Sequence, residues 1–183
     1  MGKPKDPMDA FTRHFMITQH THLSDKGTNA EREILPWLKL ASQLNPNKIE
    51  SYTVGAFWLR TLGRTNEAEQ FLREGLEHNP QSYEILFELG RCRFERKDLD
   101  HARRFWLLAF SRWREQENGK PKEQQNRFVA EEILNHLARL EARAGNREAA
   151  IQWLNIVRKT SPYPNEIDKR IEEVRAGKLL DEP

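Results

Sequence analysis

Residues 49–82 read IESYTVGAFWLRTLGRTNEAEQFLREGLEHNPQS, and this 34-residue stretch decides the fold. In its first half, small or apolar residues recur at spacings of three and four, the pattern of one helix face: Tyr52, Gly55, Ala56 and Leu59. The second half repeats that spacing with Ala68, Leu72, Gly75 and Leu76. Gly63 separates the halves where a tight turn needs a positive φ, and Pro80 ends the second helix because it lacks an N–H donor. The stretch predicts two antiparallel helices that approach closely at small residues, namely Ala56, Ala68 and Gly75.

The same two-helix pattern recurs along the chain. Residues 83–116 repeat it at an offset of 34, and residues 131–164 repeat it after a longer interval of 48. Residues 15–48 have the same length but share only three positions with the pattern: Leu38, Ala41 and Pro46. We interpret them as a divergent first unit. Recurrence in register predicts a stack of units, and large aromatic side chains are expected to fill the interfaces between them: Trp37, Trp58, Trp106 and Trp153.

Residues 49–82 resemble the tetratricopeptide repeat, whose pattern is W-x2-L-G-x2-Y, then G, A-x3-F, A and P. The matching signature residues are Tyr52, Ala56, Leu59, Gly63, Ala68, Leu72, Gly75 and Pro80. The chain departs from the pattern at Gly55, which replaces the usual leucine. In the next unit, Lys97 stands at the turn glycine and Arg114 at the terminal proline. Without that proline, the second helix of this unit is expected to run on toward Glu117.

The resemblance implies an all-α fold, a right-handed α-α superhelix (solenoid) of about four helical hairpins with a C-terminal capping helix. A single domain is expected over residues 8–179, between a flexible N-terminus at 1–7 and a tail at 180–183. Residues 117–130 form a polar insert between units. Residues 165–179 are expected to form the capping helix, with one apolar stripe that covers the last hairpin: Ile167, Ile171 and Val174.

Another apolar stripe lies before the first unit. A helix that begins near Met8 would carry on one side Phe11, Phe15 and Met16, with Ile17 beside them. This face needs a partner. Residues 19–29 are turn-forming by composition, and a second helix is expected from there to about Leu44. Pro36 falls in its first turn if that helix starts near Glu33, and otherwise a kink is expected.

Composition bounds the class of protein. The chain has 183 residues, of which 32% are charged and 37% hydrophobic, and it contains no apolar run long enough to span a membrane. We expect a cytoplasmic protein without membrane insertion, although a chain trimmed of an upstream anchor would look the same. The 30 basic and 28 acidic residues are interspersed, which argues against a general polyanion binder. A single cysteine, Cys92, excludes an intramolecular disulfide.

The motifs of common catalytic sites are missing from the sequence. It has no Gly-rich phosphate loop, no nucleophile elbow and no metalloprotease motif, so we expect neither an enzyme nor a cofactor. His20 and His22, with Asp25 nearby, are candidate metal ligands, but their spacing fixes no third ligand. A solvated turn is the favoured interpretation, and we predict no metal site. Cys92 is interpreted as a small core residue.

An arginine-rich and aromatic segment raises nucleic acid as an alternative partner. Its basic and aromatic residues are Arg91, Arg93, Arg96, Arg103, Arg104, Arg112, Arg114, Phe94, Phe105, Trp106 and Trp113. Such residues can grip phosphates and stack on bases, and HARRFWLLAF resembles the second helix of half-a-TPR repeats in RNA-processing scaffolds. Acidic residues interleave with these arginines at helical spacing, which favours ion pairs on a solvated surface. An RNA-associated scaffold is the alternative to a protein-binding one.

The tetratricopeptide resemblance implies that the first helix of each unit lines a concave groove that binds a peptide or helix of a partner protein. The groove positions carried onto this chain are Glu50, Thr53, Phe57, Arg60, Thr61, Glu84, Phe87, Arg91, Phe94, Glu95, Glu132, Asn135, Arg139, Ala142 and Arg143. Phe57, Phe87 and Phe94 are expected to be apolar contacts, although Phe87 and Phe94 would also suit packing against adjacent helices. We predict a non-catalytic protein-interaction module, with self-association as a further option.

Overall fold

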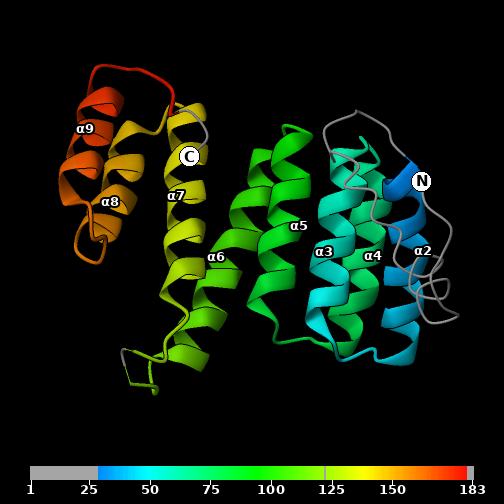
Figure 1. Ribbon diagram of the computed structural model, residues 1–183. Helices are drawn as coiled ribbons and strands as arrows, with labels where there is room; N and C mark the ends of the chain where they lie inside the picture. The colour runs from blue at the N-terminus through cyan, green and yellow to red at the C-terminus, as the bar shows by residue number, and fades with distance from the viewer. Residues whose placement is uncertain (1–28, 122, 181–183) are drawn as a thin grey trace, which may run out of the picture.

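The computed structural model describes residues 29–121 and 123–180, which contain helices and no strand. In chain order (Figure 1) the helices are α2 (Asn29–Leu44), α3 (Ile49–Thr61), α4 (Thr65–His78), α5 (Tyr83–Glu95), α6 (Leu99–Glu117), α7 (Arg127–Arg143), α8 (Arg147–Arg158) and α9 (Pro164–Arg175). The predicted all-α fold is confirmed. None of the described helices has both the length and the apolar character needed to cross a lipid bilayer.

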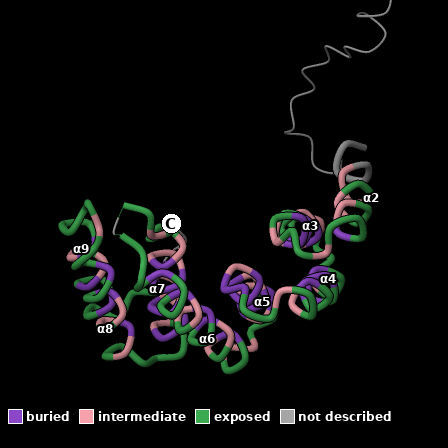
Figure 2. Tube along the Cα trace, turned by 90° about the horizontal axis from the view of Figure 1, so that it is seen from below, coloured by how far each residue is buried: buried purple, intermediate pink, exposed green. Residues whose placement is uncertain are grey.

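Consecutive helices pair into three hairpins, α3 with α4, α5 with α6, and α7 with α8. Helix α2 packs against α3 at one end of the stack, and α9 packs against α8 at the other. Seen end-on in Figure 2, the helices form an open arch, with α3, α5 and α7 on its inner side and α4, α6 and α8 on its outer side. Contacts link α3 to α5 and α5 to α7. This arrangement is the predicted solenoid.

The turn inside each hairpin uses one backbone conformation. Gly63 and Gly145 have φ of 74° and 83° at equivalent positions of their units. Lys97 occupies the same position in the middle unit with φ of 63°, although its side chain makes this left-handed conformation unfavourable. The fold therefore imposes the glycine geometry on a lysine.

Glycines permit close helix contacts inside two of the hairpins. A Cβ atom at Gly55 would clash with the Phe71 ring, and one at Gly90 would clash with the Trp106 indole. This explains why glycine replaces the expected leucine at position 55. The buried Trp106 indole donates a hydrogen bond from Nε1 to the Phe87 carbonyl at 3.0 Å. In the α3–α4 and α5–α6 hairpins, a large aromatic side chain of one helix thus packs directly against a glycine of the other.

Burial tests the residues that were expected to fill the interfaces. Trp106 is fully buried, and Trp58 and Trp153 are half-buried. Trp37 fills no interface between the described helices, because 70% of its surface is exposed. Cys92 is fully buried, as expected of a core residue, and burial raises the pKa of its thiol to about 12.

The segment between α6 and α7 is shorter than predicted. Helix α6 ends at Glu117, as expected without the terminal proline, but α7 begins at Arg127 rather than at 131. The intervening loop is anchored at both ends. The buried Glu117 accepts a hydrogen bond from the Asn126 N–H through Oε2 at 2.9 Å, and Trp113 Nε1 donates to the Asn126 carbonyl at 2.7 Å.

The C-terminal helix covers the last hairpin. Its apolar stripe is buried in one cluster with residues of α7 and α8, as predicted: Ile167, Ile171 and Val174. Two predicted boundaries need correction. The helix ends at Arg175 instead of 179, close to Gly177 with its φ of 77°. Leu180, predicted to belong to a free tail, is buried in the same cluster, because the chain folds back after α9.

At the other end of the chain, α2 begins at Asn29, which places Pro36 inside the helix and beyond its first turn. Pro36 has no N–H to donate to the preceding turn of the helix. The predicted N-terminus at 1–7, the helix from Met8 and the histidines at 20 and 22 lie outside the described residues.

Candidate functional site

The helices that carry the predicted groove residues lie on the inner side of the arch. Helices α3, α5 and α7 lie along it in succession (Figure 2), and each is the first helix of its hairpin. The ten residues expected to contact a partner are Glu50, Thr53, Phe57, Arg60, Glu84, Phe87, Arg91, Phe94, Asn135 and Arg139. Phe57 leaves 47% of its surface exposed and is the accessible aromatic residue of this set. Its ring lies edge-on to Trp58, with 5.5 Å between the centroids.

Two predicted aromatic contacts are buried instead. Phe87 is 4% exposed and lies edge-on to His136, with ring centroids 5.1 Å apart. Phe94 is 6% exposed and packs against Trp106 at 5.4 Å. The expectation that both rings project into the groove is therefore corrected. Both rings pack between helices, Phe87 against His136 and Phe94 against Trp106. The alternative interpretation, packing against adjacent helices, had anticipated this.

Between α3, α5 and α7 the structure forms a cleft of about 250 Å³, which we call the inner cleft. Its lining residues are Arg60, Arg91, Phe94, Glu95, Glu132, His136 and Arg139. Four of these seven residues belong to the predicted contact set: Arg60, Arg91, Phe94 and Arg139. Phe94 thus contributes to the wall of the cleft although it is not exposed on the surface.

Ion pairs hold the two arginines at the α3–α5 side of the inner cleft. Arg60 pairs with Glu88 and donates from Nε to Glu95 Oε1 at 2.8 Å. Arg91 Nη1 lies 3.3 Å from Glu88 Oε1, and its guanidinium is 5.8 Å from the centroid of the Phe87 ring. The shared carboxylate of Glu88 therefore positions both guanidinium groups along the cleft.

Helix α7 supplies further charged groups. The guanidinium groups of Arg139 and Arg143 lie 5.2 and 4.8 Å from the centroid of the Phe94 ring, within the range of cation–π contacts. Glu132 is partly buried in the cleft wall. Burial raises the pKa of its carboxyl, while the nearby positive charge of Arg91 opposes this shift. The cleft thus combines the aromatic ring of Phe94 with arginine side chains. It also contains the carboxyl group of Glu132, whose neutral form is favoured by burial.

Asn135 has a different role from the one predicted. Its Oδ1 accepts a hydrogen bond from Arg170 Nη1 of α9 at 2.8 Å. Burial lowers the pKa of Arg170. Asn135 does not line the inner cleft and instead connects α7 to α9. Sequence reasoning missed Glu88, His136 and Arg170. Glu88 and His136 occupy one equivalent position in their units, and the interval of 48 residues between units is the signal in the sequence that relates them.

A comparison with known families identifies one part of this stack. The family model described as tetratricopeptide repeat matches residues 59–106, which span the crossing from the first complete hairpin into the second. Residues 59–106 of this chain thus carry the pattern of the tetratricopeptide repeat.

Solved structures agree with this fold. A crystal structure of MamA protein superposes with a TM-score of 0.61 at 16% identity, and the match covers 81% of this chain and 75% of that one. A second crystal structure of MamA gives a TM-score of 0.55 at 16% identity, covering 78% of this chain and 85% of that one. At this identity the likeness shows the fold alone. No curated protein sequence matches the chain.

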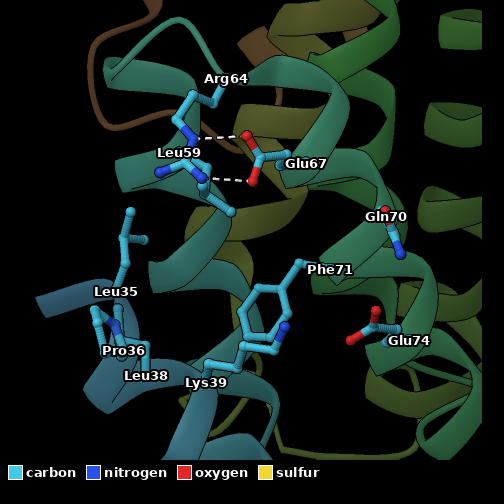
Figure 3. Close-up of a pocket in the computed structure, with 10 residues that line it drawn as sticks. All are labelled: Leu35, Pro36, Leu38, Lys39, Leu59, Arg64, Glu67, Gln70, Phe71 and Glu74. Atoms are coloured by element: carbon cyan, nitrogen blue, oxygen red, sulfur yellow. Dashed lines mark hydrogen bonds and ion pairs between the residues drawn. The ribbon is translucent and has the colours of Figure 1, made fainter. Parts of the chain in front are cut away.

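The outer side of the stack has a second hollow, which we call the outer crevice. It lies between α2 and α4, has a volume of about 450 Å³, and was not predicted from the sequence. Figure 3 shows Phe71 of α4 pointing toward the side formed by Leu35, Pro36 and Leu38 of α2. The rim carries the ion pair of Arg64 with Glu67, whose two N–O distances are 2.6 and 2.5 Å.

The later repeats fill the space that corresponds to the outer crevice. Leu35 and Leu59 line the crevice, and the equivalent residues one unit later are Glu69 and Arg93, which form an ion pair. One unit further on, Arg103 Nε donates to Glu141 Oε1 at 2.6 Å. The crevice is open because two leucines stand where the next junctions have long charged side chains.

Several arginines of the arginine-rich segment form ion pairs. Arg93 and Arg96 pair with Glu69, Arg103 pairs with Glu141, and Arg112 pairs with Glu115. The ion pairing was expected, but Glu69 and Glu141 are buried and lie on other helices, so their pairs are not on a solvated surface. Within the described residues, no group of three or more histidine, cysteine, aspartate or glutamate side chains is arranged to hold a metal ion.

Proposed function

We propose that this protein is a non-catalytic interaction module that binds an extended peptide or a helix of a partner protein along the inner side of the arch. The observation that carries the proposal is the inner cleft, which Arg91, Phe94 and Arg139 line together. The family match and the fold support a protein-interaction role in general.

The chemistry of the groove narrows the class of partner segment. The exposed ring of Phe57 offers an apolar contact on α3, and the inner cleft offers guanidinium groups on α5 and α7. An apolar side chain followed by an acidic one would satisfy both regions. Aromatic and arginine side chains usually contribute most of the binding energy at protein interfaces. We therefore propose a ligand segment with apolar and mixed-charge residues, as the groove composition predicts.

Capture of partners by the native chain and two matched variants tests this proposal. The groove variant is Phe57→Ala/Arg91→Ala/Arg139→Ala. The control removes one exposed leucine and two exposed arginines from the outer helix α6: Leu108→Ala/Arg104→Ala/Arg114→Ala. Partners that bind the groove should be captured by the native chain and the control but not by the groove variant, with circular dichroism spectra unchanged.

For a partner identified in this way, Arg91→Ala alone should weaken binding by about 1–3 kcal/mol, since it removes a guanidinium from the cleft wall. Isothermal titration calorimetry measures this change. Equal loss of binding in the outer-helix control would show that the inner groove is not the binding surface.

A further inference from the structure

One face of α2 is apolar and uncovered. Trp37, Leu40 and Leu44 are 70%, 43% and 78% exposed, and their spacing of three and four places them on the same side of the helix. Three large apolar side chains at one end of the stack are unusual for a solvent-facing surface. Since α2 packs against α3 with its other face, this stripe lacks a partner among the described helices.

The equivalent positions in later units show where the partner of Trp37 should come from. Phe71 stands one unit after Trp37 and packs on Tyr52 of α3, with ring centroids 5.0 Å apart. Trp153, at the same position of the last unit, packs edge-on against Phe110 of α6, with ring centroids 6.5 Å apart. In both cases the contact is with a helix that lies earlier in the chain. The residues that precede α2 in the chain are those before residue 29.

Val54 on α3 leads to the same conclusion independently. It is 42% exposed. The equivalent residue of α5 is Glu88, which pairs with Arg60 of α3, and that of α7 is His136, whose ring contacts Phe87 of α5. This position therefore faces the first helix of the preceding hairpin. Val54 faces the corner beside α2, where no described helix lies.

We propose that residues 8–18 of this chain dock as a helix in the corner between α2 and α3, with Phe11 and Phe15 against Trp37 and Val54. The 28 residues before α2 are joined directly to its first residue. Phe11 and Phe15 are four residues apart and lie on one side of a helix. The chain's own segment is therefore the occupant at the highest local concentration.

The dimensions of the corner allow this arrangement. A helix of 11 residues is about 16 Å long, and the stripe from Trp37 to Leu44 covers about 10 Å. Residues 19–28 span up to about 33 Å when extended, which exceeds the length of α2, about 24 Å.

Chemical cross-linking distinguishes this segment from a second copy of the chain. The variant Thr12→Cys/Ala41→Cys places thiols on the proposed segment and on the apolar face of α2. The control Thr12→Cys/Glu77→Cys moves the second thiol to the exposed side of α4. Cys92 should stay unreactive because it is fully buried. With a short bis-maleimide, we expect an intramolecular cross-link in the first variant and little in the control.

A cross-linked dimer in place of the monomeric product would show that a second copy covers the face, and equal yields in both variants would show that residues 8–18 do not dock there. Either result overturns the proposal.

Hydrogen exchange adds a second measurement on the full chain. Phe11→Ala/Phe15→Ala should speed amide exchange in α2 about tenfold and leave α5 to α8 unchanged, whereas the matched control Thr12→Ala/Thr18→Ala should change neither. Unchanged exchange in α2, or a loss of protection that is equal in all helices, would contradict docking at this corner.

Discussion

Two junctions of the stack have the same backbone arrangement and opposite chemistry. Where α2 meets the next hairpin, Leu35 and Leu59 leave an outer crevice of about 450 Å³. Where α4 meets the following hairpin, the equivalent residues Glu69 and Arg93 form an ion pair, joined by Arg96 at 3.0 Å. The backbone of a repeat thus fixes which positions meet, while the side chains decide whether the junction is filled.

The third junction, where α6 meets α7, shows how the signs of the charges affect the order of the units. Here Arg103 and Glu141 hold the equivalent positions with the signs reversed. If the unit that carries Glu69 stacked directly on the unit that carries Glu141, two carboxylates would meet. Like charges in a partly buried interface are costly, so the reversal favours the correct order of units. At the first junction Leu35 and Leu59 are uncharged, so no charge repulsion there opposes a wrong order of units.

Loss of the Glu69 carboxylate should have the largest effect. Glu69 is 6% exposed and pairs with Arg73, Arg93 and Arg96. Glu69→Leu should lower the free energy of unfolding by about 3 kcal/mol, because it leaves partly buried guanidinium groups without their carboxylate. Urea denaturation measures this value.

The double variant Glu69→Leu/Arg93→Leu copies the first junction into the second. It should recover most of the stability, since an apolar pair can replace a buried ion pair at little cost. A double variant as unstable as the single one would show that the junctions are not interchangeable.

Acidification should weaken the two ion-paired junctions and spare the apolar one. Burial alone would raise the pKa of Glu141, but hydrogen bonds from Arg103 and Asn146 hold it below its ordinary value of 4.5. The pKa of Glu69 is likewise lowered by hydrogen bonds from Arg73 and Arg93, which outweigh its burial. A lowered pKa contributes stability that is present above the unfolded value and is lost as the pH falls through the folded one.

Unfolding experiments from pH 7 down to pH 3 should therefore show a falling free energy below about pH 4.5. The loss should be smaller in Glu69→Leu/Arg93→Leu, which lacks one of the two pairs. The effect is expected to be milder than removal of a carboxylate, because a protonated carboxyl still forms hydrogen bonds. Identical pH profiles for the two proteins would refute the role of Glu69.

The reverse graft should have a moderate effect. Leu35→Glu/Leu59→Arg introduces the charged pair of the second junction into the outer crevice. We expect each single variant to be less stable than the native chain, and the double variant to recover about 1 kcal/mol of their summed loss as coupling energy. A double-mutant cycle by chemical denaturation measures this quantity, and additive losses would show that the pair does not form at this junction.

The smallest expected change concerns the hairpin turns. Lys97→Gly should raise the free energy of unfolding by about 0.5–1 kcal/mol, since glycine adopts a positive φ without steric cost. Gly63→Ala is the converse change at the equivalent turn and should lower stability by a similar amount. Thermal unfolding followed by circular dichroism measures both. A destabilised Lys97→Gly protein would indicate that the lysine side chain makes contacts that outweigh its backbone conformation.

Local patterns determined the fold. The spacing of three and four across residues 49–82, the glycine turns and the recurrence of the unit predicted helical hairpins stacked in a solenoid. Each of these signals acts between residues a few positions apart, so it can be read along the chain. The stripe of Ile167, Ile171 and Val174 likewise predicted the helix that covers the last hairpin.

Tertiary packing decided which residues are available for binding. Phe87 and Phe94 occupy groove positions by register, yet both are buried because Trp106 and His136 from other helices close over them. Glu88 holds Arg60 from 28 residues further along the chain. Leu35 and Leu59 line an open crevice, whereas the equivalent residues Glu69 and Arg93 form an ion pair at the next junction. Burial and ion pairing depend on which side chains meet across helices, and that is set by the packed stack rather than by any local pattern.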